Sequence, residues 1–257
     1  MRVSVAELSQ WIGLVFWPFL RIGACLMVAP MFGANTVPRR MRILLALAVT
    51  VAVLPQLSNP GIELLSPAGL ATTVQQLLIG VALGFTLQVL FDALTLAGQL
   101  VANSMGLGFA FNIDPLRGVS SPVLGQLYLI LGTLTFLALD GHLALLEVLT
   151  RSFSSLPVGP EGLDLDHLRA ISLWGTELFT GSLRIALPAV TALLVVNLAF
   201  GVTSRAAPAL NLFAVGLPVT LVFGLVIVLI GLPAMQGAFT SLLADTFNTL
   251  TAIVGGG

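Results

Sequence analysis

Apolar and polar positions follow one another in long blocks along this chain. Six apolar segments occupy about residues 12–31, 44–57, 73–101, 123–139, 174–200 and 212–235. A weaker amphipathic stretch follows at 237–254. Several segments reach the ~20 residues that an α-helix needs to cross the hydrocarbon core of a bilayer. The pattern predicts an all-α integral membrane protein: one domain over residues 1–257, built as a bundle of about six long apolar helices.

Composition supports a membrane protein and excludes several other classes. Hydrophobic residues make up 57% of the chain and charged residues only 8%, whereas a soluble domain carries about 25% charged residues. The formal net charge of −1 argues against nucleic-acid binding. A single cysteine, Cys25, excludes a disulfide within the chain. The first apolar segment is longer than the ~7–15 residues of a signal-peptide core, so we expect a retained first membrane helix.

The arginines between the apolar segments predict an orientation. Three connections on one side carry Arg39, Arg40, Arg42, Arg117 and Arg205. The positive-inside rule places these connections towards the cytoplasm, and both termini then lie outside. The polar region at about 140–172 has an excess of acidic residues and is expected outside as well.

The stretch at about 103–122 breaks the apolar pattern without being a solvated domain. Irregular backbone at membrane depth is tolerated only where protein buries it or where it lines a cavity. Its glycines remove side chains, its bulky residues could seal a channel by excluding water, and its Asp-Pro pair is typical of a turn. The residues concerned are Gly106, Gly108, Phe109, Phe111, Ile113, Asp114 and Pro115. On composition, the stretch is either a gate or a short connecting loop packed on neighbouring helices.

Three ionisable residues lie inside apolar segments: Arg21, Asp92 and Arg184. Each costs about 2.5–3.5 kcal/mol on insertion scales, so it must face protein, water or a partner chain. One hypothesis is an ion or proton path with Asp92 as carrier, in a permease that works alone. The favoured alternative is pairing within the bundle or across a subunit interface, because Asp92 sits in unbroken helical sequence.

Motifs for catalysis are missing from the sequence. His142 and His167 lie in the polar region and form no zinc-binding pattern. There is no GxSxG elbow and no Walker A motif. We therefore predict no catalytic, cofactor-binding or metal site.

Three stretches together resemble the FliR family of flagellar export proteins. They are RIGACLMVAPMFGANTVPRRMRILLALAVT at 21–50, MGLGFAFNIDPLRGVSSPVLGQ at 105–126 and VNLAFGVTSRAAPALNLFAVGLPV at 196–219. The third is the most specific match, and the order of segments agrees over nearly the whole chain. A homologous family, SctT, serves virulence secretion systems. The short motifs NIDP and SRAAPALN, however, are similar to those of the flagellar branch.

The resemblance implies a non-catalytic subunit of the export gate of flagellar type III secretion. Such a gate is a helical hetero-oligomer of the bacterial inner membrane, in the flagellar basal body. FliP-like and FliQ-like subunits would form the channel for unfolded flagellar proteins with this chain, a FlhB-like subunit would associate, and membrane lipid would surround it.

The resemblance also implies roles for particular residues. The loop 106–122 would plug the closed channel. Arg205, Pro208 and Asn211 match the third stretch and are expected to make structural or intersubunit contacts. Arg21, Asp92 and Arg184 would pair with neighbouring subunits.

Overall fold

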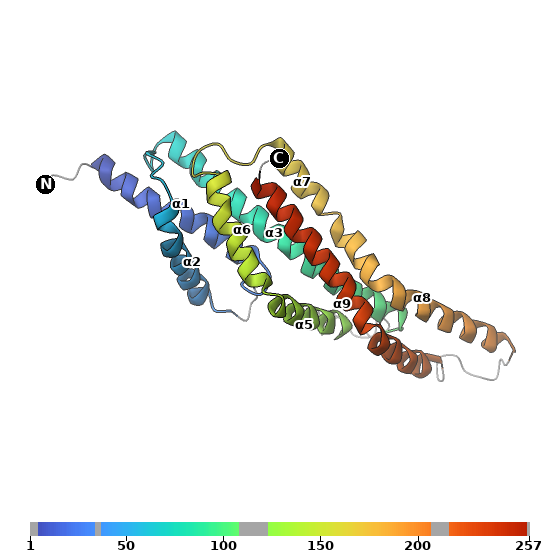
Figure 1. Cartoon of the computed structure of the whole chain (residues 1–257). Helices are drawn as coiled ribbons and strands as arrows, with labels where there is room; N and C mark the ends of the chain where they lie inside the picture. The colour runs from blue at the N-terminus through green and yellow to red at the C-terminus, as the bar shows by residue number, and fades with distance from the viewer. Residues whose placement is uncertain (1–4, 34–36, 108–122, 207–215, 256–257) are drawn as a thin grey trace, which may run out of the picture. The chain divides into compact units, whose positions relative to one another are not determined.

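The computed structural model describes residues 5–33, 37–107, 123–206 and 216–255, and the regular structure there is helical throughout (Figure 1). The α-helices are α1 (Val5–Val28), α2 (Arg39–Val53), α3 (Pro67–Ser104), α5 (Val123–Ala138), α6 (Gly141–Ser155), α7 (Leu165–Trp174), α8 (Glu177–Ala206) and α9 (Leu217–Gly255), and a short 3-10 helix, η1 (Leu54–Gln56), follows α2. The prediction of an all-α membrane protein is confirmed.

Among the described residues, fewer helices are long and apolar enough to cross a membrane than there are apolar segments in the sequence. In the described ranges three helical stretches are long and apolar enough: Pro67–Ser104, Leu165–Thr203 and Pro218–Gly255. The bent pair α5 and α6, at 66° to each other, could supply a fourth. Of the six predicted apolar segments, the first two form shorter helices in the described residues: the apolar helix Ile12–Val28 and α2, which has 15 residues. The sixth segment and the amphipathic tail, predicted separately, form the single helix α9 of 39 residues.

The chain divides into two compact units. The first comprises Met1–Val89, Asp140–Gly175 and Asp245–Gly257, and the second comprises Leu90–Leu139 and Thr176–Ala244. The helices α3 and α9 each contribute residues to both units. The prediction of a single domain stays a prediction.

In the first unit, glycines let α3 lie close against α1. A Cβ atom on Gly84 would lie 2.7 Å from the Cys25 carbonyl oxygen, and one on Gly80 would collide with the Arg21 carbonyl oxygen. Small residues are typical of such close helix crossings in membranes. Trp17 of α1 is fully buried and donates its indole N–H to Thr73 Oγ1 of α3 at 3.1 Å.

In the second unit, three aromatic rings form the centre of the core. Phe91 of α3 meets Phe136 of α5 and Phe239 of α9 edge to face, with ring centroids 5.4 Å and 6.1 Å apart. All three side chains are 0–1% exposed. Edge-to-face pairs add about 0.5–1.5 kcal/mol beyond the burial of their area, so this cluster fixes the three helices together.

Candidate functional site

The irregular stretch that begins at 103 starts with a defined end of α3. Gly106 has a φ of +82°, which glycine adopts without strain. The Leu107 N–H donates to the Ala102 carbonyl and the Gly106 N–H donates to the Asn103 carbonyl, both at 3.0 Å. This pair of bonds is a Schellman motif with Gly106 in the left-handed position. Gly106 therefore ends the helix, a role that the sequence analysis did not separate from that of the other glycines.

Two other helices hold this end of α3 in place. Asn197 of α8 donates its side-chain amide to the Ser104 carbonyl at 3.1 Å. Met105 is fully buried. A Cβ atom on Gly224 of α9 would lie 2.5 Å from Met105 Cε, so only glycine leaves room for the methionine there. The base of the predicted plug is thus fixed by α8 and α9.

The remaining predicted plug residues lie outside the described residues. They are Gly108, Phe109, Phe111, Ile113, Asp114 and Pro115. Pro208 and Asn211 of the third matching stretch lie outside them too. Their predicted roles stay predictions.

Arg21 is fully buried and satisfied by its own chain. Its Nε donates to Gln76 Oε1 of α3 at 2.7 Å. Its Nη1 donates to the carbonyl and hydroxyl oxygens of Ser152, and its Nη2 donates to the Leu156 carbonyl at 2.7 Å. The guanidinium also stacks on Phe153, 4.3 Å from the ring centroid.

The position of this guanidinium explains how the charge is tolerated. It lies at the C-terminal end of α6, where the Ser152 carbonyl accepts the Leu156 N–H as well and the helix dipole favours a cation. Arg21 thereby joins α1, α3 and α6. Pairing within the bundle, one of the roles predicted for Arg21, therefore needs neither an acidic partner nor a second chain.

Asp92, Arg184 and Arg205 are all exposed in the chain, unlike Arg21. Asp92 and Arg184 each take part in an interaction within the structure. Arg205 lies in the last turn of α8, where a cation is favoured by the helix dipole. Their intersubunit roles stay predictions.

The helices differ in how much of their apolar surface the chain itself covers. In the most apolar window of Pro67–Ser104, 67% of residues are buried, against 22% for Leu165–Thr203 and 22% for Pro218–Gly255. The exposed large apolar side chains of α8 and α9 are Phe179, Leu183, Leu187, Leu194, Val195, Leu198, Val202, Val222, Phe223, Leu225, Val226, Leu229 and Ile230. These side chains require lipid or other protein chains around them.

Within the described ranges, no group of three or more His, Cys, Asp and Glu side chains is arranged to hold a metal ion. Asp164 and His167 instead form a capping box at the start of α7. The His167 backbone N–H donates to Asp164 Oδ1 at 2.9 Å. This bond, followed by the one from the His167 side chain, holds the pKa of Asp164 below its usual value.

Sequence reasoning missed the partners that position these residues. Gln76 and Ser152 bind Arg21, and Asn197 and Gly224 hold the end of α3. One signal was available: Gln76 and Asn197 are amides within apolar segments, where a polar side chain needs a partner. Which partner each one finds depends on tertiary packing.

Comparisons with known proteins agree with the resemblance over most of the chain. Residues 12–246 match the model of the family described as bacterial export proteins, family 1. The flagellar biosynthetic protein FliR of Escherichia coli K12 is 37% identical over 254 residues, which are 99% of this chain and 97% of that protein. The protein of the same name from Aquifex aeolicus is 33% identical over 236 residues, covering 90% and 89%. That from Bacillus subtilis is 28% identical over 244 residues, covering 92% and 94%.

Proposed function

The chain belongs to the family of bacterial export proteins, family 1, as a flagellar FliR-type member, and from this premise we propose that it is a non-catalytic subunit of the flagellar export gate. The resemblance to the FliR family is confirmed, and the chain is a membrane-embedded component of the flagellar export apparatus. The proposal adds that it forms, with FliP-like and FliQ-like subunits, an inner-membrane channel for unfolded flagellar proteins at the basal body. A FlhB-like subunit would associate with this channel.

The single observation that carries the proposal is the uncovered apolar surface of α8 and α9. Only 22% of the most apolar window of each stretch is buried within the chain. At 1.5 Å per residue, the 39 residues of α9 extend about 59 Å, roughly twice the ~30 Å hydrocarbon core. The chain itself buries the later part of α9, from Met235 to Val254, so the uncovered apolar side chains lie at 222–230 of α9 and at 179–202 of α8. We expect neighbouring protein chains along part of this surface.

Removal of this surface tests the proposed assembly. The pair Leu229→Asn and Ile230→Asn places two amides on an exposed apolar part of α9, where these residues are 68% and 73% exposed. We expect the chain to reach the membrane but to lose co-purification with FliP-like and FliQ-like subunits, and cells to lose flagella. Leu65→Asn, at a leucine that is 91% exposed in the connection before α3, is the matched control and should leave both unchanged. Unchanged co-purification in the double variant would contradict the proposal.

We further propose that the loop 106–122 plugs the closed channel. Support comes from its base, which the Schellman motif, Asn197 and Met105 fix at the end of α3. A fixed base lets a loop return to one position after it is displaced. Deletion of residues 108–113 keeps Gly106 and should make membranes with the assembled gate leaky to ions.

The control for this deletion replaces residues 108–113 by six alternating glycines and serines, which keeps the length and removes the bulk. Both variants should leak if bulky side chains seal the channel, and only the deletion should leak if length alone matters. An assembled gate whose conductance is unchanged by the deletion would refute the plug. Uptake of a small solute by the reconstituted chain alone, abolished by Asp92→Asn, would instead favour the permease.

A further inference from the structure

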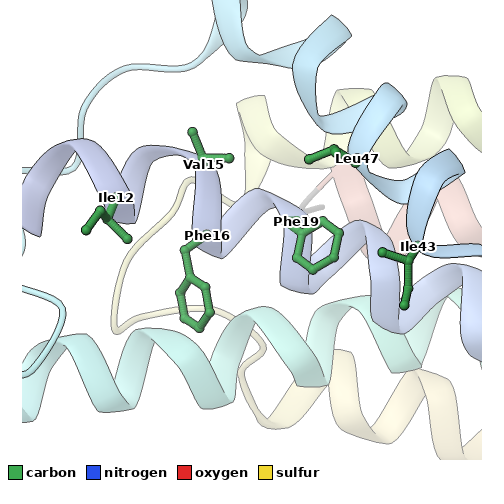
Figure 2. A pocket seen from close by; sticks show the side chains of 6 residues that line it. All are labelled: Ile12, Val15, Phe16, Phe19, Ile43 and Leu47. Carbon is green, nitrogen blue, oxygen red and sulfur yellow. The ribbon is translucent and has the colours of Figure 1, made fainter. Parts of the chain in front are cut away.

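An apolar groove follows the contact between α1 and α2 in the first unit. Its first hollow, of about 530 Å³, is lined entirely by apolar side chains: Ile12, Val15, Phe16, Phe19, Ile43 and Leu47 (Figure 2). A second hollow, of about 310 Å³, shares Phe19 and Ile43 with the first and continues past Gly23 and Met27. The two hollows together form one groove, since they have walls in common.

The groove ends at a group of arginines. Arg42 belongs to the lining of the second hollow and donates its Nη2 to the Val37 carbonyl at 3.0 Å. Arg39 and Arg40 lie in the same first turn of α2 and are exposed. Arg42 thus lines the groove, and two more arginines precede it in the same helical turn.

The start of α2 offers nothing within its own turn to balance this charge. The first turn contains no acidic residue, and Pro38 at the N-cap makes no side-chain hydrogen bond. A helix N-terminus carries a partial positive charge, so three arginines there are disfavoured unless an anion is close. The exposed Arg39 and Arg40 and the helix end therefore both favour an anion at this place.

We propose that the groove binds an anionic phospholipid, with an acyl chain between α1 and α2 and the phosphate group against Arg39, Arg40 and Arg42. The distribution of charged and apolar residues along the groove favours a lipid over a protein helix. A phospholipid has one anionic end and an apolar remainder, as this site requires, whereas an amphipathic helix carries its apolar stripe along its whole length beside polar residues. Basic pockets next to membrane helices are known to select anionic head groups.

The arginines provide the first test, in the complex purified from native membranes. Native mass spectrometry measures binding of phosphatidylglycerol and of phosphatidylcholine to that complex. We expect tighter binding of phosphatidylglycerol, weakened roughly fivefold by Arg39→Gln or Arg40→Gln and about thirtyfold by both together, at about one arginine's contribution each. The control is Arg169→Gln, which removes an exposed arginine from α7 and should leave the preference intact.

The groove itself provides an independent test. Gly23 lines the second hollow, and a Cβ atom there would meet no other atom within 4 Å. Gly23→Leu therefore fills the hollow without disturbing the backbone, and we expect it to weaken phosphatidylglycerol binding at least tenfold. Gly23→Ala is the matched control. Like Gly23→Leu, it replaces glycine by a better helix former, but it leaves most of the hollow open.

Two results would overturn the proposal. One is equal binding of the two lipids, or a preference that survives both Gly23→Leu and the double arginine variant. The other is a protein occupant: a photoreactive group attached at Leu47→Cys would then add the mass of a peptide from another chain instead of the mass of a phospholipid. These readouts are independent of export, so the lipid site can fail while the proposed gate function holds, and the reverse.

Discussion

The helices α3 and α9 are nearly equal in length and both strongly apolar, but the chain covers their most apolar windows to very different extents. They contain 38 and 39 residues, and the mean hydropathy of their most apolar windows is 2.0 and 2.4. The α3 window is 67% buried by the chain, and the α9 window is 22% buried. High hydropathy therefore predicts that both helices avoid water, but not whether this chain or its surroundings cover them.

The glycines account for much of this difference. On α3, Gly80 and Gly84 allow α1 to approach, and a Cβ atom on Gly98 would lie 2.6 Å from Gly125 of α5. On α9, Gly224 makes one close approach, whereas Gly231 and Gly237 have nothing within 4 Å of an added Cβ. Glycine thus marks an intramolecular crossing on α3 and a site open to the surroundings on much of α9.

The largest effect is expected where a glycine crossing is blocked. Gly80→Leu would force the side chain into the Arg21 backbone, so α1 and α3 must separate. Overpacking typically costs 1–3 kcal/mol, and a block by backbone places this variant at about 3 kcal/mol or more. Unfolding in a detergent titration, with helicity as the signal, measures the loss.

The matched substitution on the other helix is Gly237→Leu in α9. It should leave the free energy of unfolding of the single chain within about 0.5 kcal/mol, because the position is open. Similar losses of unfolding free energy in Gly80→Leu and Gly237→Leu would contradict the difference in packing between α3 and α9.

The next largest loss of stability is expected on substitution of Arg21, the buried arginine that contacts α3. Arg21→Met keeps an apolar stem but leaves Gln76 Oε1 and the Leu156 carbonyl without their donor. Each unsatisfied buried group costs about 1–3 kcal/mol, so we expect the two groups to cost roughly 2–6 kcal/mol together. Arg184→Met, at an exposed position of α8, should cost the isolated chain less. Unfolding of both variants under the same conditions provides the comparison, and an equal loss would show that burial does not separate the two arginines.

A smaller effect is expected where α8 holds the end of α3. Asn197→Ala removes the hydrogen bond to the Ser104 carbonyl, which contributes about 0.5–1.5 kcal/mol. Alanine also improves helix propensity, so the difference from Asn248→Ala, an exposed asparagine of α9, isolates the bond. Hydrogen exchange of the amides of 101–105 should rise in the first variant alone. Equal exchange in the two variants would mean that Met105 fixes this end by itself.

The smallest effect lies outside both long helices, at the capping box of α7. The pKa of Asp164 is lowered in the folded protein, so its stabilising contribution is complete above the unfolded value of about 3.9 and is lost as the pH falls through the folded value. An NMR titration should place the Asp164 midpoint below 3.9. His167→Ala should raise it only in part, since the largest cause is the backbone N–H of residue 167, which the variant keeps. A midpoint at or above 3.9 in the unsubstituted chain would contradict the capping geometry.

Much of the architecture could be predicted from the sequence, for identifiable reasons. Apolar segments of about 20 residues can satisfy their backbone only as helices, so the all-α prediction needed no tertiary information. The number of spans could not be predicted as well. Nothing in the periodicity shows that the sixth segment and the tail continue as one helix, or that the chain bends at Asp140, where φ is +55°.

The candidate site was predicted only in part. Gly106 was predicted only as one of the plug residues, and its left-handed conformation at the end of α3 was not predicted. Arg21, Asp92 and Arg184 looked equivalent in the sequence, yet only Arg21 is fully buried. Their difference arises from partners such as Ser152, 131 positions from Arg21, which no local pattern connects.

That sequence separation has a consequence for synthesis of the chain. Arg21 leaves the ribosome long before Ser152 and Leu156, which follow it by 131 and 135 positions. At roughly 5–20 residues per second, about 7–27 s pass before these two acceptors are translated. During this interval the guanidinium must stay near water or lipid head groups, because the hydrocarbon core would leave it uncompensated. The first helix to be made is therefore expected to be among the last to settle, and completion of α6 is the event that allows it.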